Sequence, residues 1–470
     1  MIYLFFIISL TFAIKEFDLT QSDSILFEEF IQEFNKQYSS ETEKNERFVI
    51  FKETLQEIRE SNSKRKSEQD AISGINFFSD MKVSEMNLNF QPSTPPIKQS
   101  QMKGKVRLPT FPDKQIPEQY FMCSSLTQRN TDRPKIDFCT TQIYQGTCGN
   151  CYAATPANAA QFYYSNLTYY FNDKKAESVK PRQFTPQRWM DKVEPNTGTK
   201  RCCGGSSFWA LKAEPTFTFL EDYPYADQNS GQTVCTKRGD QNATVAIQMR
   251  LQSQPSFSVE DNTTPEGILA LKKMMYFYGP LNVNIKGDAT GFKNYRSGIY
   301  TFPDGCAKQS SNHLVALMGY GNDNGEEFFL AKNSWYKGWG FEENYIKIST
   351  KRLCNIAYCP WENGNCENYY YNVGSCLLDK NCDDCDKNSL ACVKCKEGST
   401  KDHRGMCVSP KDAEPDTNTN NNNNNTNTNN TNNNNNNNNN STNTNKKDNA
   451  QSIFSLMITF IVVILVSFMG

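Results

Sequence analysis

Cys151 is the residue whose surroundings best suit nucleophilic chemistry. It ends the motif QGTCGNC and is followed by an alanine-rich stretch that favours a helix beginning near Cys151. A thiol at a helix N-terminus has its thiolate stabilised by the helix dipole and by free N–H groups. Gln145, six residues upstream, can direct its side-chain amide to the same place. Together with the Cys151 N–H it would form an oxyanion hole for acyl transfer.

The chain has two histidines, and they differ in context. His403 lies between charged residues in a cysteine-rich segment, which is typical of a solvated loop histidine. His313 opens the apolar run HLVALMGYG. We therefore expect His313 to be the imidazole that acts on Cys151 as general base and acid.

A hairpin would place an orienting residue beside His313. The run after His313 is followed by an Asn-Gly turn signal and then by EFFLAKNSW. Folding these strands about a centre near residue 323 puts His313 opposite Asn333, whose oxygen would fix the imidazole tautomer. Trp335 would cover that hydrogen bond from water. The alternative is that two polar residues face each other without a catalytic role.

A second interpretation of the Cys151 motif is a redox or metal pair. Cys148 and Cys151 form a C-x-x-C motif, which occurs in both kinds of site. Against it, Cys148 has a natural disulfide partner in the run that begins Cys202-Cys203. We therefore favour Cys151 as an unpaired nucleophile.

Composition and charge indicate how many domains to expect, which partners to exclude and which cellular compartment the chain enters. The 470 residues exceed one compact domain, and the net charge of −1 gives no reason to expect nucleic acid as a partner. Seventeen cysteines favour an oxidising compartment, and the odd number leaves one thiol outside complete pairing. The apolar run at 2–14 is typical of a secretory signal, although a basic start is missing. A buried core segment is its alternative.

The remaining pattern predicts seven consecutive parts. The uncharged apolar end at 452–469 fits either a lipid-anchor signal, with small residues for attachment upstream, or a transmembrane helix of marginal length. The proline-rich linker is where we expect a protease to cut. The parts are a signal peptide (1–14), a small helical module (15–90), the linker (91–117), a globular domain (118–358), a cysteine-rich module (359–410), an Asn/Thr-rich disordered stalk (411–451) and a hydrophobic membrane-anchor segment (452–470).

Three blocks in order resemble the papain/cathepsin family of cysteine proteases. They are the motif around Cys151, the His313 strand, and KNSW at 332–335 followed by GWG at 338–340. The separations of His313 and Asn333 from Cys151 are longer than is usual, which implies insertions. The helical module resembles the family's inhibitory pro-segment. It fits one helical motif with Glu43, Arg47, Ile50, Phe51, Ile58 and Asn62, and a second motif with Gly74, Asn76, Phe78 and Asp80.

The resemblance implies the fold and the roles of the residues. It implies an α+β, papain-like two-lobed fold, with a helical lobe and an antiparallel β-barrel-like lobe. Cys151 would be the nucleophile, His313 the general base and acid, Asn333 the orienter, and Gln145 the oxyanion-hole donor. Among the family's branches, the chain looks closest to membrane-anchored proteases of parasitic amoebae.

The chain departs from the family pattern at three places near the nucleophile. Tyr152 replaces the usual Trp, and Pro156 should kink the following helix or limit its start. Lys192 stands where the family often has a disulfide cysteine. None of these changes removes a catalytic group.

The resemblance also implies disulfides and a substrate pocket. The implied pairs are Cys148–Cys202, Cys306–Cys354 and a rewired Cys203–Cys235, which leaves Cys123 with Cys139. The eight cysteines at 359–407 would pair among themselves, although Cys382-x-x-Cys385 and Cys392-x-x-Cys395 also have zinc-like spacing. The implied substrate-binding residues are Gly204, Gly205, Ser206, Ser207, Asn284, Leu314 and Trp335, with Cys359 less securely aligned.

Weaker motifs complete the expectations. Asn166, Asn242 and Asn262 open N-x-T motifs for glycans, and residues 238–240 spell the adhesion tripeptide RGD, which is mostly a chance match.

We expect no metal and no cofactor. The predicted function is that of a papain-like endopeptidase, made as a zymogen and held at a cell-surface or lysosome-like membrane. Its predicted partners are protein substrates, its own pro-segment and the membrane. The alternative is an adhesion protein on an inactive protease scaffold, which would bind a host-surface receptor.

Overall fold

The computed structural model describes the helical module and most of the globular domain. The predicted signal peptide, stalk and membrane-anchor segment, most of the predicted linker, and His403 lie outside the described residues. The described residues are 15–86, 111, 114–139, 142–171, 174–179, 181–192, 200–207, 210–211, 214, 216–228, 230–231, 235, 249–253, 257–259, 262–306, 311–342, 344–354, 356–357, 372–373, 381–385, 392–401 and 407–408.

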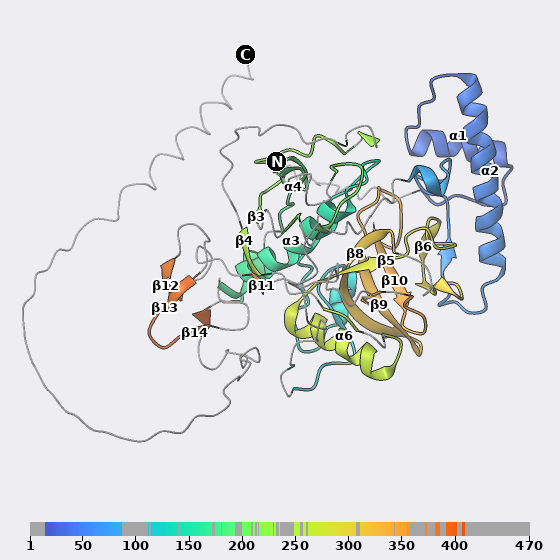
Figure 1. Ribbon diagram of the computed structural model, residues 1–470. Helices are drawn as coiled ribbons and strands as arrows, with labels where there is room; N and C mark the ends of the chain where they lie inside the picture. The colour runs from blue at the N-terminus through green and yellow to red at the C-terminus, as the bar shows by residue number, and fades with distance from the viewer. Residues whose placement is uncertain are drawn as a thin grey trace, which may run out of the picture. The chain divides into compact units, whose positions relative to one another are not determined.

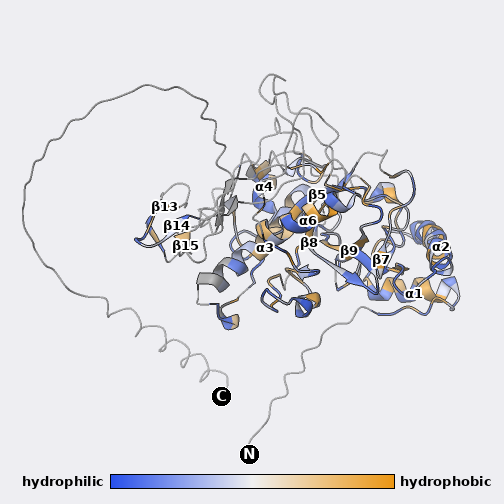
Figure 2. Cartoon of the chain, turned by 90° about the horizontal axis from the view of Figure 1, so that it is seen from below, coloured by the Kyte–Doolittle hydropathy of each residue, from blue (hydrophilic) through white to orange (hydrophobic). Residues whose placement is uncertain are grey.

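Two helices form the N-terminal module, drawn in blue in Figure 1: α1 (Asp23–Glu33) and α2 (Glu41–Ser63). Ser40 caps α2 by accepting the backbone N–H of Glu43, as expected of a serine at an N-cap. Figure 2 shows both hydrophobic and hydrophilic residues along α2, as expected of an amphipathic helix. The buried residues of the module form a small core of their own, made of Leu26, Phe27, Phe30, Phe51, Leu55, Ile58 and Ile75.

The chain leaves the module through short elements that run along the globular domain. They are β1 (Ile72–Ser73) and the 3-10 turn η1 (Val83–Glu85). β1 pairs antiparallel with β6 (Tyr295–Ser297) of the globular domain. The module is therefore joined to the rest of the fold by backbone hydrogen bonds as well as by side chains.

The helical lobe is built around α3 (Cys151–Phe171). This helix begins at the predicted nucleophile and continues past Pro156, so the proline does not end it. α3 packs against β8 (His313–Asp323) of the sheet. The lobe's other elements are η4 (Ala176–Ser178), α4 (Gln187–Lys192), and the small sheet of β3 (Thr216–Phe217), β4 (Met249–Ser253) and β11 (Asn372–Val373). The 3-10 turn η3 (Ser125–Arg129) contacts the other lobe, where Arg129 pairs with Asp323.

The second lobe is a six-stranded sheet in the order β2-β8-β9-β10-β7, with β5 also paired to β8. The pairing of β10 with β7 is parallel and the other pairings of this sheet are antiparallel, so the α+β, papain-like fold is confirmed with a mainly antiparallel, mixed sheet. α6 (Pro265–Tyr278) packs against β8. The strands are β2 (Tyr120–Phe121), β5 (Leu281–Ile285), β7 (Ile299–Tyr300), β8 (His313–Asp323), β9 (Glu326–Lys332) and β10 (Tyr345–Ser349).

The cysteine-rich module contributes two small hairpins. Disulfides join Cys382 to Cys392 and Cys395 to Cys407. Cys382, Cys392 and Cys407 lie close enough to share a metal, but all three sulfurs are used in these disulfides, so the zinc alternative is not favoured here. The hairpin strands are β12 (Cys382–Cys385), β13 (Cys392–Cys395), β14 (Thr400–Lys401) and β15 (Cys407–Val408).

Of the helices that the structure describes, none is long and apolar enough to span a bilayer.

Candidate active site

Cys151 is the first residue of α3 and is 1% exposed. Its side chain packs against Leu314, the residue that follows His313 on β8. Within the described part of the chain it is the cysteine that takes part in no disulfide. The thiol therefore sits at a helix N-terminus, beside the strand that begins with the predicted base.

His313 and Asn333 form the predicted contact. The Nε2 of His313 lies 2.7 Å from the Oδ1 of Asn333. That oxygen also accepts the backbone N–H of Ser334 at 2.8 Å, so it acts as an acceptor and Nε2 must donate. In the neutral ring the other nitrogen, Nδ1, is then unprotonated, and it has no hydrogen-bond partner among the described residues. Nδ1 is thus the atom available to take a proton.

Burial keeps this imidazole neutral. His313 is completely buried, and its ring lies 5.3 Å from that of Trp335, as expected for a cover over the hydrogen bond. Burial lowers the pKa of His313 from its ordinary 6.5 to about 4, and the hydrogen bond to Asn333 opposes this shift in part. The closed site therefore disfavours the imidazolium.

The predicted strand register is wrong, although the contact it predicted is present. β8 pairs with β9 so that Asp323 lies opposite Glu326, and the register shifts between Leu317 and Gly319. The hairpin is thus centred on Asn324-Gly325, both at positive φ, one to two residues beyond the predicted centre. Because β9 ends at Lys332, Asn333 reaches His313 from the segment after the strand.

Gln145 is positioned by a residue that the sequence reasoning missed. The Oγ of Ser334 donates to the Oε1 of Gln145 at 2.7 Å, and the Gln145 Nε2 donates to the carbonyl of Cys148 at 3.1 Å. Ser334 therefore links the orienting Asn333 to the predicted oxyanion donor. Its place inside the KNSW motif was the available signal.

Two further residues that the sequence did not indicate support Cys151 and His313. Thr155 on α3 donates its hydroxyl to the carbonyl of Leu314 at 2.8 Å, which ties the nucleophile's helix to the strand of the base. Gly287 lies against His313, where an added Cβ would be only 2.8 Å from the His313 Cβ. No pattern in one sequence indicates either contact, because both depend on the packing of β8.

The comparisons with known proteins agree with this geometry. Residues 128–362 match the family model "Papain family cysteine protease", and residues 27–86 match "Cathepsin propeptide inhibitor domain (I29)". The chain belongs to the papain family. It is a cysteine-type endopeptidase, synthesised as a zymogen whose pro-segment is its own inhibitor.

Relatives of this protease cover most of its length. A viral cathepsin of Choristoneura fumiferana nuclear polyhedrosis virus is 28% identical over 344 residues, which is 72% of this chain and 89% of the relative. Cysteine proteinase 2 of Zea mays is 26% identical over 72% of this chain and 83% of the relative. The solved structure of digestive procathepsin L2 from Tenebrio molitor shares the fold, with a TM-score of 0.55, 22% identity, and coverage of 72% of this chain and 98% of that one.

The pro-segment of this papain-family protease covers the Trp335 side of the site. The Phe78 ring meets the Trp335 ring edge-on with centroids 5.5 Å apart, and Phe77 stacks on Tyr336 at 3.8 Å. Within the pro-segment, Asp80 accepts hydrogen bonds from Lys36 and Tyr38. Arg47 binds both carboxylate oxygens of Glu85 at 2.9 Å.

A lysine of the protease domain is inserted into the pro-segment. The Nζ of Lys293 donates to the Thr54 hydroxyl at 3.0 Å and to the Met81 carbonyl at 2.9 Å. Its own carbonyl accepts the Asn76 side-chain amide at 2.9 Å. Burial lowers the pKa of Lys293, and the nearby Glu57, Asp80, Glu85 and Glu53 oppose this shift.

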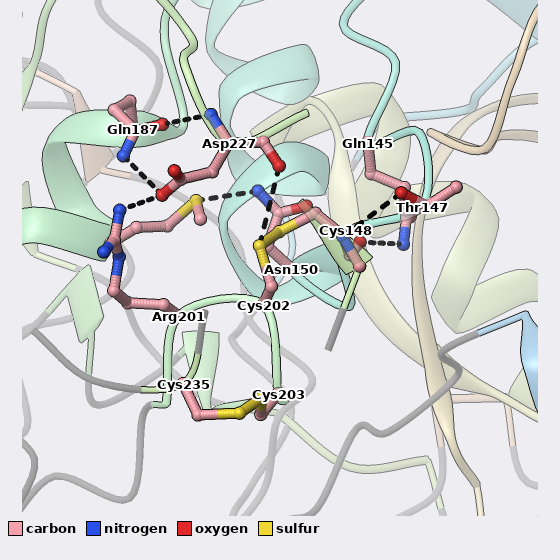
Figure 3. The surroundings of a disulfide bond; sticks show 12 residues. Gln145, Thr147, Cys148, Asn150, Gln187, Arg201, Cys202, Cys203, Asp227 and Cys235 are labelled. Carbon is pink, nitrogen blue, oxygen red and sulfur yellow. Dashed lines mark hydrogen bonds and ion pairs between the residues drawn. A yellow bond between two sulfur atoms is a disulfide. The ribbon is translucent and has the colours of Figure 1, made fainter. Parts of the chain in front are cut away.

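The disulfides of the protease domain have the pairings that the sequence implied. Cys148 bonds to Cys202, so the C-x-x-C interpretation of Cys148 with Cys151 does not hold (Figure 3). The other pairs are Cys123–Cys139, Cys203–Cys235 and Cys306–Cys354.

The implied substrate-binding residues flank Cys151 from two elements. Asn284 on β5 lies opposite Leu314 on β8, next to the base. The loop that carries Gly204, Gly205, Ser206 and Ser207 is buried and follows Cys203, whose backbone bridges to Gly149 just before the nucleophile. Cys359 lies outside the described residues.

The three glycan motifs fall in different surroundings. Asn166 lies on α3 and is half-buried, while Asn242 and the RGD tripeptide lie outside the described residues. Asn262 is 6% exposed, and its Nδ2 donates to the carbonyls of Ile356 at 2.5 Å and Cys354 at 3.2 Å. In the folded protease that nitrogen is not available to a glycan, so the expectation for Asn262 is wrong.

Proposed function

We propose that Cys151, His313, Asn333 and Gln145 hydrolyse peptide bonds through a thioester acyl-enzyme. The observation that carries the proposal is the His313 Nε2–Asn333 Oδ1 contact, because it leaves Nδ1 free to exchange a proton with a thiol at the start of α3. The buried ring of Trp335 excludes water from this contact.

The proposed reaction has two halves. The Cys151 thiolate attacks the peptide carbonyl carbon, the C–S bond forms, and the oxyanion is held by the Cys151 N–H and the Gln145 amide. The tetrahedral intermediate collapses as imidazolium Nδ1–H protonates the leaving amine. His313 then takes a proton from water, which attacks the thioester, and the acid product leaves as the thiolate is restored.

The pro-segment must leave before substrate can enter. We infer that cleavage within 91–117 releases it, and that acidification is the trigger, because charged side chains such as the Lys36–Asp80 and Arg47–Glu85 pairs hold the pro-segment together. An activation rate that is equal at mildly acid and neutral pH would contradict this trigger.

The setting of the enzyme is part of the proposal. The apolar ends of the sequence support a signal peptide and a C-terminal membrane attachment, with the catalytic domain on the lumenal or extracellular side. This arrangement resembles the membrane-anchored proteases of parasitic amoebae. Release from membranes by a phosphatidylinositol-specific phospholipase would identify a lipid anchor, whereas retention after that treatment and after alkaline carbonate would identify a transmembrane helix.

A biotinylated epoxide that is specific for papain-type thiols tests the chemistry. The reduced, mildly acidified and processed protein is incubated with the reagent, and the label is located by mass spectrometry. We expect label on Cys151 that disappears in His313→Ala, with Cys151→Ala as the blank. An unlabelled Cys151 after confirmed removal of the pro-segment would contradict the proposal and favour the adhesion alternative.

A further inference from the structure

One short loop, residues 200–204, contacts the chain on both sides of Cys151. Before the nucleophile, the Gly149 N–H donates to the Cys202 carbonyl at 2.9 Å, next to the Cys148–Cys202 disulfide. After it, the Tyr152 hydroxyl donates to the Arg201 carbonyl at 3.1 Å. The position of the Cys151 backbone N–H therefore depends on where this loop lies.

The side chain of Arg201 fixes the loop to two buried carboxylates. Arg201 is 3% exposed, and its guanidinium pairs with Asp227 (Figure 3). The guanidinium also lies 3.3 Å from the Oδ1 of Asp191. Gln187 donates to both carboxylates, at 2.8 Å to Asp227 and 3.0 Å to Asp191. The Tyr223 hydroxyl completes the cluster by donating to Asp191 at 2.9 Å.

The segment that begins with Asp227 holds the loop of Gln145. Its next residue, Gln228, accepts the Thr147 N–H on its carbonyl at 3.1 Å. The Gln228 side-chain amide donates to the Tyr144 carbonyl at 2.9 Å. The residues on both sides of Gln145 are thus hydrogen-bonded to Gln228, whose neighbour Asp227 pairs with the Arg201 side chain.

The residues beside Cys151 are therefore hydrogen-bonded to the loop 200–204, and the residues beside Gln145 are hydrogen-bonded to the segment that begins with Asp227. The Arg201–Asp227 ion pair joins these two supporting segments. We propose that Arg201 is a positioning residue that sets the distance between the Gln145 amide and the Cys151 N–H. This inference rests on the oxyanion role given to Gln145 and Cys151 in the proposed function.

The intact buried cluster contributes little net stability, which leaves room for a geometric role. Two carboxylates and one guanidinium are buried together, and such clusters are weak contributors to stability compared with apolar residues of the same volume. By contrast, a displacement of a catalytic group by about 1 Å can lower the rate of the catalysed reaction by about 100-fold. Removal of one partner alone leaves an opposite charge buried without compensation, which is strongly destabilising, so the turnover of each variant must be measured per folded, titrated active site.

The test compares amide hydrolysis with alkylation of the same thiol. Alkylation of Cys151 by iodoacetamide develops no oxyanion, so it reports the thiol and the imidazole without the hole. For Arg201→Met and Asp227→Asn, measured on processed enzyme normalised by epoxide titration, we expect kcat to fall about 10- to 100-fold. KM and the alkylation rate should stay within about twofold, and Arg201→Lys should recover part of kcat.

Arg188→Met is the matched control, because Arg188 is equally an arginine of the helical lobe, 9% exposed, but pairs with Glu214. The inference is overturned if the Arg201 and Asp227 variants change kcat no more than this control. It is also overturned if alkylation and turnover fall together. If Arg201→Met does not fold, Asp227→Asn, which keeps the shape of the side chain, decides. Failure of the wild-type enzyme to cleave amides would refute the proposed function itself.

Discussion

The imidazole of His313 and the amide of Asn333 meet at 2.7 Å although they are not paired in the β-ladder. The amide oxygen is itself fixed by the Ser334 N–H, so the imidazole is held by a group that cannot rotate away without losing a second hydrogen bond. The orientation of the base is therefore built into the end of β9 and does not depend on substrate.

Removal of the orienting amide should slow turnover without affecting binding. A hydrogen bond to a group that becomes charged contributes about 1.5–3 kcal/mol. For Asn333→Ala we therefore expect kcat to fall about 10- to 100-fold, with KM nearly unchanged, in steady-state assays of the processed enzyme. Ser349→Ala, at a buried serine on β10, is the control. An unaltered kcat would show that Trp335 alone orients the ring.

Addition of one methyl group beside the base should also reduce activity. In Gly287→Ala the new Cβ would lie 2.8 Å from the His313 Cβ and 3.2 Å from its Cγ, so the imidazole must move. We expect a loss of about tenfold or more in kcat in a protein that still folds. Gly74→Ala in the pro-segment, where the nearest atom would be at 3.4 Å, is the control and should give a fully active processed enzyme. Wild-type turnover in Gly287→Ala would contradict the close packing.

Loss of the inserted lysine should open the zymogen. Lys293→Met leaves the Thr54 hydroxyl and the Met81 carbonyl without the ammonium to which they are bonded. We expect Cys151 in the unprocessed protein to be alkylated about tenfold faster, since loss of about 1.4 kcal/mol from the closed state raises the open fraction by that factor. Lys272→Met, whose ammonium pairs with Glu327 in the protease domain, should behave as wild type. Equal labelling rates in both variants would remove Lys293 from the closure.

Acid should destabilise the zymogen through His313. Its pKa is about 4 in the folded state and 6.5 ordinarily, so between these values the unfolded chain binds a proton that the folded chain does not. The stability that His313 contributes is fully present above pH 6.5 and is lost as the pH falls toward 4. In urea titrations on a Cys151→Ala background, His313→Gln should therefore lose less stability over this window, by up to about 3 kcal/mol. Parallel pH profiles would contradict the buried, neutral imidazole.

The sequence predicted which residues form the candidate site, but not how the fold places them. The residue types and their order in the chain pointed to Cys151, His313 and Asn333, because the chemistry restricts which side chains can serve. The strand register could not be predicted from the sequence, because the irregularity between Leu317 and Gly319 lies where β2 pairs with β8. An added Cβ at Gly319 would lie 2.5 Å from the carbonyl of Tyr120, roughly two hundred residues away in the chain.

The supporting contacts were equally hidden from the sequence. Arg201 and Asp227 are charged residues in loops, which a single sequence presents as surface. Only the folded structure buries them together, and it bonds the loop of Arg201 to Gly149 and Tyr152. Tyr152 was noted as a departure from the family pattern, and the structure gives it a partner in the Arg201 carbonyl.

In the secretory setting proposed above, the buried amide of Asn262 would have to reach its final partners before a sugar is attached to it. Oligosaccharide transfer in the secretory pathway acts on sequons of a chain that has not yet folded, and the same Nδ2 that would accept the sugar must later donate to the carbonyls of Ile356 and Cys354. Those carbonyls lie more than ninety residues further along the chain, so the motif emerges long before its final partners are synthesised. A molecule modified there would be excluded from the native state, and the yield of active enzyme would depend on the race between transfer and folding.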